Sequence, residues 1–396
     1  METVNYQCPA CGGKLHFSHE TGKVECDYCN SNFTVEEVEQ YYAAKQEKAD
    51  TKAETQKEKA DKSENNTANV DSVVEEGKQQ AEKVAQEGLD PVAAYVQRSN
   101  WAKTEEGALS AYTCSSCGAE LIVDIATAVT QCPYCGNNTV LPGTLGNTLK
   151  PDLVIPFKKG KEDAIAALKQ YYKGKKFLPK SFADENHFED IQGVYVPFWL
   201  YDATTDAQAS FECTKVRSWR EGKYQITETD FYDAMRAGTM SFTRVPVDGS
   251  QRMPDTHMDA IEPYDYSELQ EFSTAFLPGY LTDRYDLDVK DCQPRAYNRM
   301  AASSVSALQG TVLGYSTVSN KSKNVSAKWE NVSYALLPVW MLHTKWNDED
   351  YLFAMNGQTG KLIGDLPVDG KKLAAWFLGL FIGVAAIATI PLMAIF

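Results

Sequence analysis

Eight cysteines of this chain form two quartets with the same internal spacing. Each quartet contains two Cys-x2-Cys pairs, and fourteen residues separate the pairs in both quartets. Two such pairs supply four thiolates to one tetrahedral Zn²⁺, and a spacing that occurs twice is poorly explained by chance. The residues are Cys8, Cys11, Cys26 and Cys29 in the first quartet, and Cys114, Cys117, Cys132 and Cys135 in the second.

Each quartet predicts a small β module of the rubredoxin-like zinc-ribbon type, at residues 1–40 and 108–150. Short alternating stretches at 14–17 and 120–124 predict the hairpin strands that bring the second Cys pair over the first. Modules of this size cannot form a core alone, and a structural Zn²⁺ supplies about 10–16 kcal/mol in comparable peptides. We therefore expect two structural Zn²⁺ ions. Disulfides and redox catalysis are the weaker alternatives, because neither a secretory signal nor a thioredoxin-like pattern accompanies the pairs.

The C-terminal segment is apolar. Residues 373–396 contain no charged side chain, and at about 1.5 Å per residue such a helix spans a hydrocarbon core of about 30 Å. The sequence predicts a single transmembrane helix at 371–396, with a buried core helix as the alternative. Lys371 and Lys372 precede the uncharged stretch, so the positive-inside rule places the N-terminal domains in the cytoplasm, at the cell membrane. Gly379 and Gly383 form a GxxxG pattern, which predicts self-association of two such helices.

A charged segment separates the two ribbons. Residues 43–94 contain no aromatic side chain and are rich in Lys, Glu, Ala and Gln. Such a stretch buries too little apolar surface to offset its ordering entropy. We interpret 41–107 as a charged linker, partly helical or disordered, which serves as a tether for the first ribbon or as a passive spacer. Just before it, Thr34 and Glu37 have the spacing of a helix capping box.

Residues 151–370 predict an α+β domain with antiparallel sheet and an internal duplication. The segment Val194–Tyr201 resembles Ala335–Leu342, since each has a Pro-x-Trp core and follows a predicted helix. We expect Trp199 and Trp340 to belong to the core of the domain, because proline begins or edges a strand and tryptophan packs well. A ligand groove lined by the two indoles is the alternative.

Catalysis and nucleic-acid binding are both disfavoured. The chain contains no nucleophile elbow, phosphate loop, zinc-protease or dinucleotide motif, so we expect that it is not an enzyme. Affinity for nucleic acid depends largely on Lys and Arg. The formal net charge is −15, and residues 107–149 contain neither Lys nor Arg. We therefore expect protein partners.

The chain resembles a Firmicutes family of TFIIB-type zinc-ribbon membrane proteins. The resemblance is carried by CPACGG with CDYC, by CSSCGAEL with CPYCGN, by VPFWLYD, and by FAMNGQTGKLIGDLP before the apolar tail. Relatives are often encoded near phage-shock-A-like and flotillin-like (SPFH) proteins, which implies such partners and a role in envelope stress or membrane maintenance.

The sequence-based hypothesis is a membrane-anchored cytoplasmic zinc-ribbon adaptor or scaffold that recruits partner proteins. A membrane-tethered nucleic-acid-binding regulator is one alternative, and a small-ligand or enzymatic role of 151–370 is another.

Overall fold

The computed structural model describes most of the chain outside the predicted linker. The described residues are 8–42 (without 12, 14, 19, 20, 27 and 39), 92, 95, 109–124, 132–136, 140–143, 149–185 and 188–393. They form a three-stranded antiparallel sheet of β1 (Leu15–Ser18), β2 (Lys23–Cys26) and β3 (Asn32–Phe33), and one large sheet. Most of the linker prediction, 41–107, therefore lies outside the described residues.

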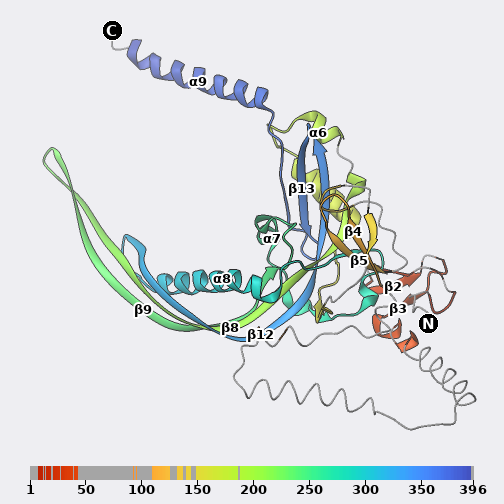
Figure 1. Cartoon of the computed structure of the whole chain (residues 1–396). Coiled ribbons are helices and arrows are strands. Elements are labelled where there is room, and N and C mark those ends of the chain that lie inside the picture. Colours follow the sequence, from red (N-terminus) through yellow and green to blue (C-terminus); the bar gives the residue numbers. More distant parts are fainter. Residues whose placement is uncertain are drawn as a thin grey trace, which may run out of the picture.

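Three long strands dominate the large sheet. The central strand β8 (Gln192–Glu221) pairs antiparallel with β9 (Tyr224–Asp248) on one side and with β12 (Thr317–Trp346) on the other. Their outer halves project from the body as a curved arm, and helix α8 (Val289–Gly310) lies along its concave side (Figure 1).

The alternation of side chains along β8 explains why α8 packs against the arm. Ala207, Ala209, Phe211 and Cys213 are buried and share one face of the strand, since successive side chains point to opposite faces. They pack against α8 residues such as Leu308. The intervening even-numbered residues of β8 are more exposed.

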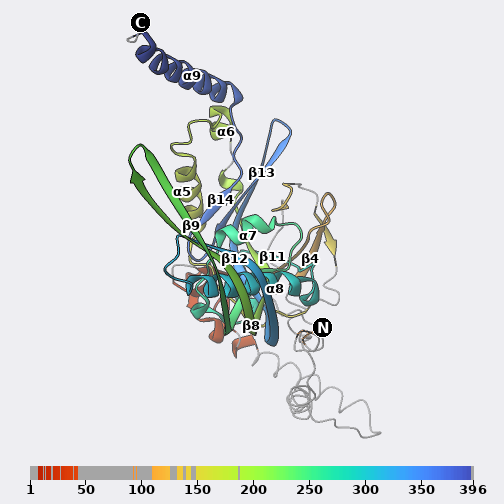
Figure 2. The same ribbon diagram turned by 90° about the vertical axis from the view of Figure 1, so that its left-hand side faces the viewer.

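The remaining elements extend the sheet or cover it. The strands are β4 (Leu109–Cys114), β5 (Glu120–Asp124), β6 (Val140–Gly143), β7 (Leu153–Val154), β10 (Gln270–Glu271), β11 (Leu281–Asp283), β13 (Glu349–Asn356) and β14 (Leu362–Gly364). The helices are α5 (Lys161–Tyr172), α6 (Lys180–Glu185), α7 (Asp255–Ile261) and α9 (Gly370–Met393), with 3-10 turns η1 (Phe188–Asp190), η2 (Tyr266–Glu268) and η3 (Thr274–Phe276). Figure 2 shows α5 and α6 on the same side of the body as α9.

The large sheet is mixed, which corrects the predicted antiparallel sheet. Strand β7 pairs parallel with β12, and β11 pairs parallel with β8. Both short strands have only two or three residues, too few to show a period of two in the sequence. Strands β4, β5 and β6 of the second ribbon belong to the same sheet.

The two helix–strand units make matching contacts. Trp199 donates its indole N–H to the Leu287 carbonyl at 3.0 Å, two residues before α8 begins. Trp340 donates to the Lys159 carbonyl at 2.7 Å, two residues before α5 begins. The two similar segments also pair with each other. Val196 lies opposite Leu337 in the β8–β12 ladder, and both are the third residue of their segments.

The same two tryptophans fill the core. Trp199 is 0% exposed and Trp340 is 6% exposed, and both indole N–H groups are bonded to backbone carbonyls. The prediction that both belong to the core is confirmed. This burial leaves little indole surface to line the alternative ligand groove.

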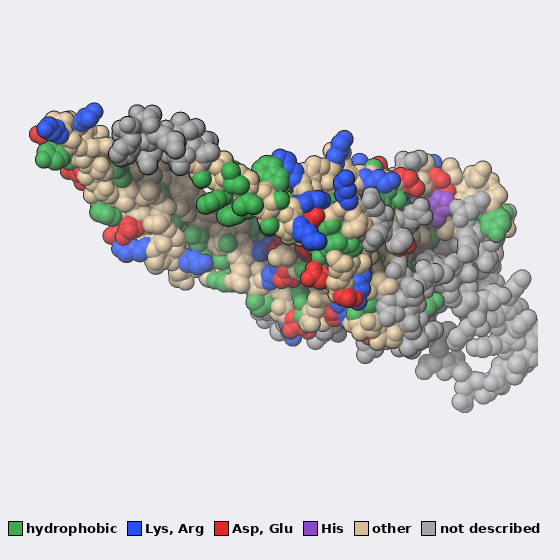
Figure 3. Space-filling model, turned by 90° about the horizontal axis from the view of Figure 1, so that it is seen from above, with side chains coloured by type: hydrophobic (Ala, Val, Ile, Leu, Met, Phe, Trp, Pro, Cys, Tyr) green, Lys and Arg blue, Asp and Glu red, His purple; other side chains and the backbone are tan. Residues whose placement is uncertain are grey.

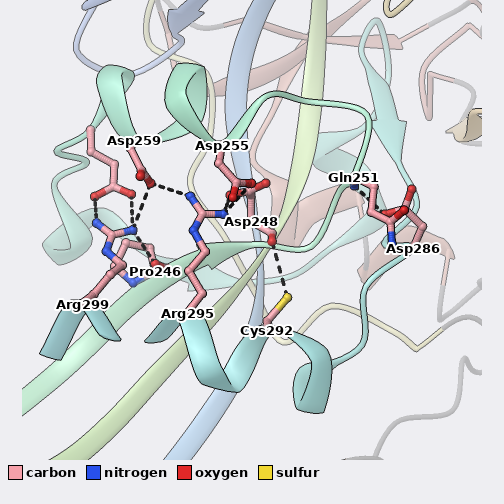
Figure 4. A network of polar contacts seen from close by, with 10 residues as sticks. Pro246, Asp248, Gln251, Asp255, Asp259, Asp286, Cys292, Arg295 and Arg299 are labelled. Atoms are coloured by element: carbon pink, nitrogen blue, oxygen red, sulfur yellow. Dashed lines mark hydrogen bonds and ion pairs between the residues drawn. The ribbon is translucent and has the colours of Figure 1, made fainter. Parts of the chain in front are cut away.

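A cluster of ion pairs fixes α8 to the body (Figure 4). Arg295 contacts Asp248, Asp255 and Asp259, while Arg299 donates to both carboxylate oxygens of Glu262 at 2.9 and 2.6 Å. Asp248 is 1% exposed, and burial raises its pKa to about 6 against the opposing effect of Arg295. The cluster links α7, α8 and the end of β9, so it sets the base of the arm.

The predicted transmembrane helix at 371–396 is corrected by the structure. Within the described part of the chain, no helix is both long and apolar enough to cross a membrane. Side chains from residue 386 onward lie outside the described residues. A Cβ atom added at Gly379 or Gly383 would meet no other atom within 4 Å, so both glycines of the GxxxG pattern face open space in this structure.

Candidate metal centres

Each predicted cysteine quartet comes together in one cluster. The Sγ atoms of Cys8 and Cys29 are 3.5 Å apart, as are those of Cys11 and Cys26. In the second quartet the corresponding distances are 3.6 Å and 3.7 Å. A tetrahedron of sulfurs about 2.3 Å from a metal has edges of about 3.8 Å. The ligand atoms of each quartet lie within 4.8 Å of one another, so both clusters could hold a metal ion.

The backbone of the Cys-x2-Cys turns shows why the sequence folds this way. The residue after the second cysteine of a turn has a positive φ at Asn30 (55°), Gly118 (71°) and Gly136 (67°). Each donates its N–H to the carbonyl of the first cysteine of that turn, at 3.0, 2.9 and 2.9 Å respectively. Glycine and asparagine adopt this conformation most readily. Amides of Ala10 and Gly13 lie 3.4 Å from the sulfurs of Cys8 and Cys11.

The thiols of the two clusters differ in acidity. The Ser31 hydroxyl and amide lower the pKa of Cys29 to about 6. Burial raises the pKa of Cys114, but backbone N–H groups of Cys117 and Ser116 outweigh it and bring the value to about 7. Burial raises the pKa of Cys132. Each cluster therefore contains one thiol that is readily deprotonated near neutral pH, which favours metal capture because thiolates are the ligands.

The second cluster is built into the large sheet. Its hairpin strand β5 pairs antiparallel with β11, with Ile122 opposite Thr282. Arg252 donates to the Gly118 carbonyl at 2.8 Å, and Arg284 pairs with Glu120 at 2.6 Å. The metal cluster and the main domain thus share one hydrogen-bonded ladder.

Buried polar side chains lie beside the same cluster, and their oxygen atoms form no hydrogen bond within the described residues. Tyr134 lies between Cys132 and Cys135 and is 9% exposed, while Asp283 and Ser250 are both 0% exposed. Burial raises the pKa of Asp283 to about 7, although Tyr134 and Ser250 face the carboxyl and oppose the shift. No sequence signal pointed to Asp283 or to Tyr134.

Asp283 predicts a pH effect on stability. Its pKa is raised from an unfolded value near 4 to about 7. The folded state therefore binds more protons than the unfolded state between these two values. The stabilisation of the folded state by this proton is fully present below about pH 4 and is lost as the pH rises to about 7. We expect the free energy of unfolding of Asp283→Asn to rise relative to that of the wild type as the pH increases from about 4 to about 7, because the wild type alone loses this stabilisation. Thermal unfolding of both proteins at matched pH and zinc concentration measures the difference; a difference that does not change with pH would contradict the assignment.

The first cluster lies against the main domain. The Phe17 and Phe276 rings are 5.3 Å apart, edge to face, and the Phe17 N–H points to the Pro278 carbonyl at 3.4 Å. This docked position differs from the freely tethered ribbon that the linker suggested. The predicted capping box is confirmed, because Thr34 and Glu37 exchange hydrogen bonds of 2.8 and 3.2 Å.

The end of the predicted linker packs in the core. Val92 is 0% exposed and Tyr95 is 3% exposed. The Tyr95 hydroxyl bonds to Asp152 and accepts from the Tyr334 N–H at 3.2 Å, and its ring lies 5.6 Å from that of Trp199. Sequence reasoning missed this anchor, although Tyr95 is the first aromatic residue after the long polar stretch.

Comparison with known proteins gives one informative relationship. No family model matches the chain, and no solved structure matches it. A protein of Bacillus subtilis (strain 168), described as uncharacterized protein YdjG, is 37% identical over 241 residues, which are 61% of this chain and 71% of the relative. This chain belongs to the YdjG family. The TFIIB-type relationship remains a prediction.

In the described part of this YdjG-family chain, two histidines lie close to carboxylates of the fold. His257 is buried and lies 3.2 Å from the Asp365 carboxylate. Burial lowers the pKa of His343, which lies 3.3 Å from Asp350. A cavity beside Tyr334 has a volume of about 10 Å³, room for about one water molecule. We therefore centre the functional argument on the cysteine clusters.

Proposed function

We propose that this protein is an adaptor whose two four-cysteine modules hold structural zinc and present surfaces to partner proteins. The observation that carries the proposal is the completeness of both clusters, each with four thiols within 4.8 Å. A site with four protein thiolates is closed, whereas catalytic zinc normally keeps one position for water or substrate. Zinc would join the two Cys-x2-Cys turns of each module and thereby stiffen it.

The charge of the chain supports protein partners. The formal net charge is −15, and Glu25, Glu36 and Glu37 belong to the first module. Each zinc centre with four thiolates formally adds two negative charges. A surface of this kind repels phosphate, on which nucleic-acid affinity largely depends. Phage-shock-A-like and SPFH-type proteins are the partners that the family resemblance implies.

Contact with a lipid surface is a further part of the proposal, and α9 supports it. Its apolar side chains are exposed, including Trp376 (53%), Phe377 (72%) and Phe381 (64%). Figure 3 shows hydrophobic side chains gathered there beside Lys and Arg. Trp376 lies 4.8 Å from the Lys176 amine. Aromatic side chains beside basic ones are typical of segments that bind the membrane interface.

Metal content gives the first test. We expect about two zinc ions per chain in the wild-type protein, and about one in Cys29→Ser and in Cys135→Ser, because each variant removes one ligand from one tetrahedral site. Elemental analysis of protein purified without added metal measures this. Cys213→Ala is the matched control, since Cys213 is buried in the arm and should leave the content at two. Iron in place of zinc, or equal loss in the control, would contradict the assignment.

A cross-linking pull-down tests the adaptor function. We expect membrane partner proteins to be recovered with the wild type and with Cys213→Ala, and lost with Cys11→Ser or Cys117→Ser. Recovery that survives loss of both metal centres would reject the adaptor role of the modules. Tight, salt-sensitive DNA binding in a mobility-shift titration would instead favour the nucleic-acid regulator.

Flotation with anionic liposomes tests the lipid contact. The wild type should float with the vesicles, and the double substitution Phe377→Ser with Phe381→Ser should remain at the bottom of the gradient. Tyr224→Ser, which removes an exposed aromatic side chain (76%) from the distant arm, is the control and should float. Equal flotation of all three proteins would contradict a lipid role for α9.

A further inference from the structure

Strand β9 forms an open edge of the arm. It pairs with β8, and no strand of the described residues pairs with its other side. The β8–β9 hairpin closes through a two-residue turn whose first residue, Gly222, has a φ of 61°. This is the pattern of a type II′ turn, whose flanking residues Glu221 and Tyr224 exchange both backbone hydrogen bonds. Even-numbered residues of β9 therefore bond to β8, and odd-numbered ones from Gln225 to Thr239 direct their N–H and C=O groups away from β8. The Met235 carbonyl among them accepts from the Arg236 side chain at 2.8 Å.

The opposite edge of the arm is covered. On β12, the carbonyl of Val318 accepts from the Gln309 side chain at 2.8 Å, and that of Val325 accepts from the Tyr297 hydroxyl at 2.7 Å. Both donors belong to α8, so the helix caps this edge. Proteins commonly protect exposed edges in this way, because unpaired backbone groups recruit another strand. From 225 to 233, the described contacts provide no such cap for the outward groups of β9.

Large apolar side chains are also exposed on β9. Phe231 is 69% exposed, Met235 is 80% exposed and Tyr232 is 40% exposed. The exposed large hydrophobic residues of the described chain include none from β12. Clustered exposure of this kind marks an interaction surface. The open backbone and the apolar side chains thus coincide on one strand.

We propose that β9 pairs antiparallel with β9 of a second copy of this chain, about a two-fold axis at Tyr232. In this register Tyr232 lies opposite Tyr232 of the second copy, and Glu228 lies opposite Arg236. The odd-numbered residues Phe231 and Asp233 form the hydrogen-bonded pairs that the open edge requires. The Phe231 side chains of the two copies are then diagonal neighbours on either side of the two-fold axis, on the sheet face away from α8.

The charges of β9 favour a second copy over another partner. Glu228 and Arg236 become two equivalent ion pairs, as expected for a self-complementary two-fold interface. Glu228 already lies 3.4 Å from Arg217 in an exposed pair, and such pairs contribute little, so it can change partner. Arg236 donates to the Thr311 hydroxyl at 3.2 Å and to the Met235 carbonyl at 2.8 Å, and in the dimer it exchanges these bonds for Glu228 of the second copy. The antiparallel direction places the two bodies at opposite ends of the joined arms, which project well away from the body (Figure 1).

Proline substitution tests the edge pairing in the full-length chain. Thr229→Pro removes an outward N–H without touching the β8 ladder, because proline is tolerated at a solvent-facing edge position. Sedimentation velocity should show a dimer for the wild type and a monomer for Thr229→Pro. Lys323→Pro is the matched control, since it removes an outward N–H from the β12 edge and should leave the dimer. A monomeric wild type, or equal effects of the two prolines, would overturn the proposal.

Charge exchange and cross-linking test the register. Glu228→Arg and Arg236→Glu should each raise the dimer dissociation constant about tenfold, and the double substitution should restore it, because opposite charges face each other again. Tyr232→Cys should give a disulfide-linked dimer on oxidation, since directly opposed non-hydrogen-bonded residues have Cα atoms about 4.5 Å apart. Tyr224→Cys lies far from the axis and should not. No rescue by the double substitution, or cross-linking at 224 alone, would exclude this register.

Discussion

Replacing Cys132 with serine is expected to destabilise the whole main domain. The substitution removes a ligand from the second metal cluster, whose strand β5 pairs with β11 of the large sheet. Metal binding to the folded state alone adds directly to its stability. A loss of about 5 kcal/mol lowers the unfolding temperature of a domain of this size by about 10–20 °C. Scanning calorimetry in the presence of zinc measures the shift.

Cys29→Ser supplies the matched comparison for that result. It breaks the first cluster, whose described contacts with the main domain involve Phe17, Phe276 and Pro278. We expect the main transition to move by less than about 3 °C, corresponding to about 1 kcal/mol. Hydrogen exchange should rise in β5 and β11 with Cys132→Ser, and in β1 and β2 with Cys29→Ser. Equal calorimetric shifts for the two variants would contradict this expectation, because the main domain would then depend on both modules to the same degree.

Replacing Tyr95 with alanine is expected to cost about 3–5 kcal/mol of stability. The change removes a buried ring that packs edge to face on Trp199, and the loss of a large buried side chain falls in this range. It also deprives Asp152 and the Tyr334 N–H of the hydroxyl that contacts both. Equilibrium unfolding in urea gives the free energy, provided that the slope stays constant.

Two controls separate packing from hydrogen bonding at this position. Tyr95→Phe keeps the ring and should cost only about 1–2 kcal/mol, because the Tyr334 N–H still donates to Asp152 at 2.8 Å. Tyr41→Ala removes a ring that is 42% exposed, and its effect should stay within about 0.5 kcal/mol. If Tyr95→Ala behaved like Tyr41→Ala, the segment around residue 95 would not be part of the core.

The metal clusters were predictable because their determinants are local. Two Cys-x2-Cys turns and a short hairpin define a ligand set within about twenty residues, and positive-φ positions such as Gly118 and Gly136 follow directly from the turn geometry. The core role of Trp199 and Trp340 was predictable for a related reason, since each lies in an apolar strand segment that can only be buried.

Contacts between distant segments were not predictable. Strands β7 and β11 have two and three residues, and their parallel pairing depends on partners far away in the sequence. The burial of Asp283 near Tyr134 and the docking of Phe17 on Phe276 bring together residues whose sequence neighbours give no hint of each other. The apolar tail led to the prediction of a transmembrane helix, which is wrong for the described part of the chain, where no helix is long and apolar enough to cross a membrane.

The sequence by itself determined the eight candidate metal ligands, the capping box at Thr34 and the two tryptophan strands, because spacing along the chain fixes short-range geometry. Only the tertiary structure decided how these parts are joined. It placed the second cluster inside the large sheet, set the first against η3, drew Tyr95 into the core and left β9 as the open edge of a long arm. These features depend on pairing between strands that are far apart in sequence, and no local pattern specifies which strands will meet.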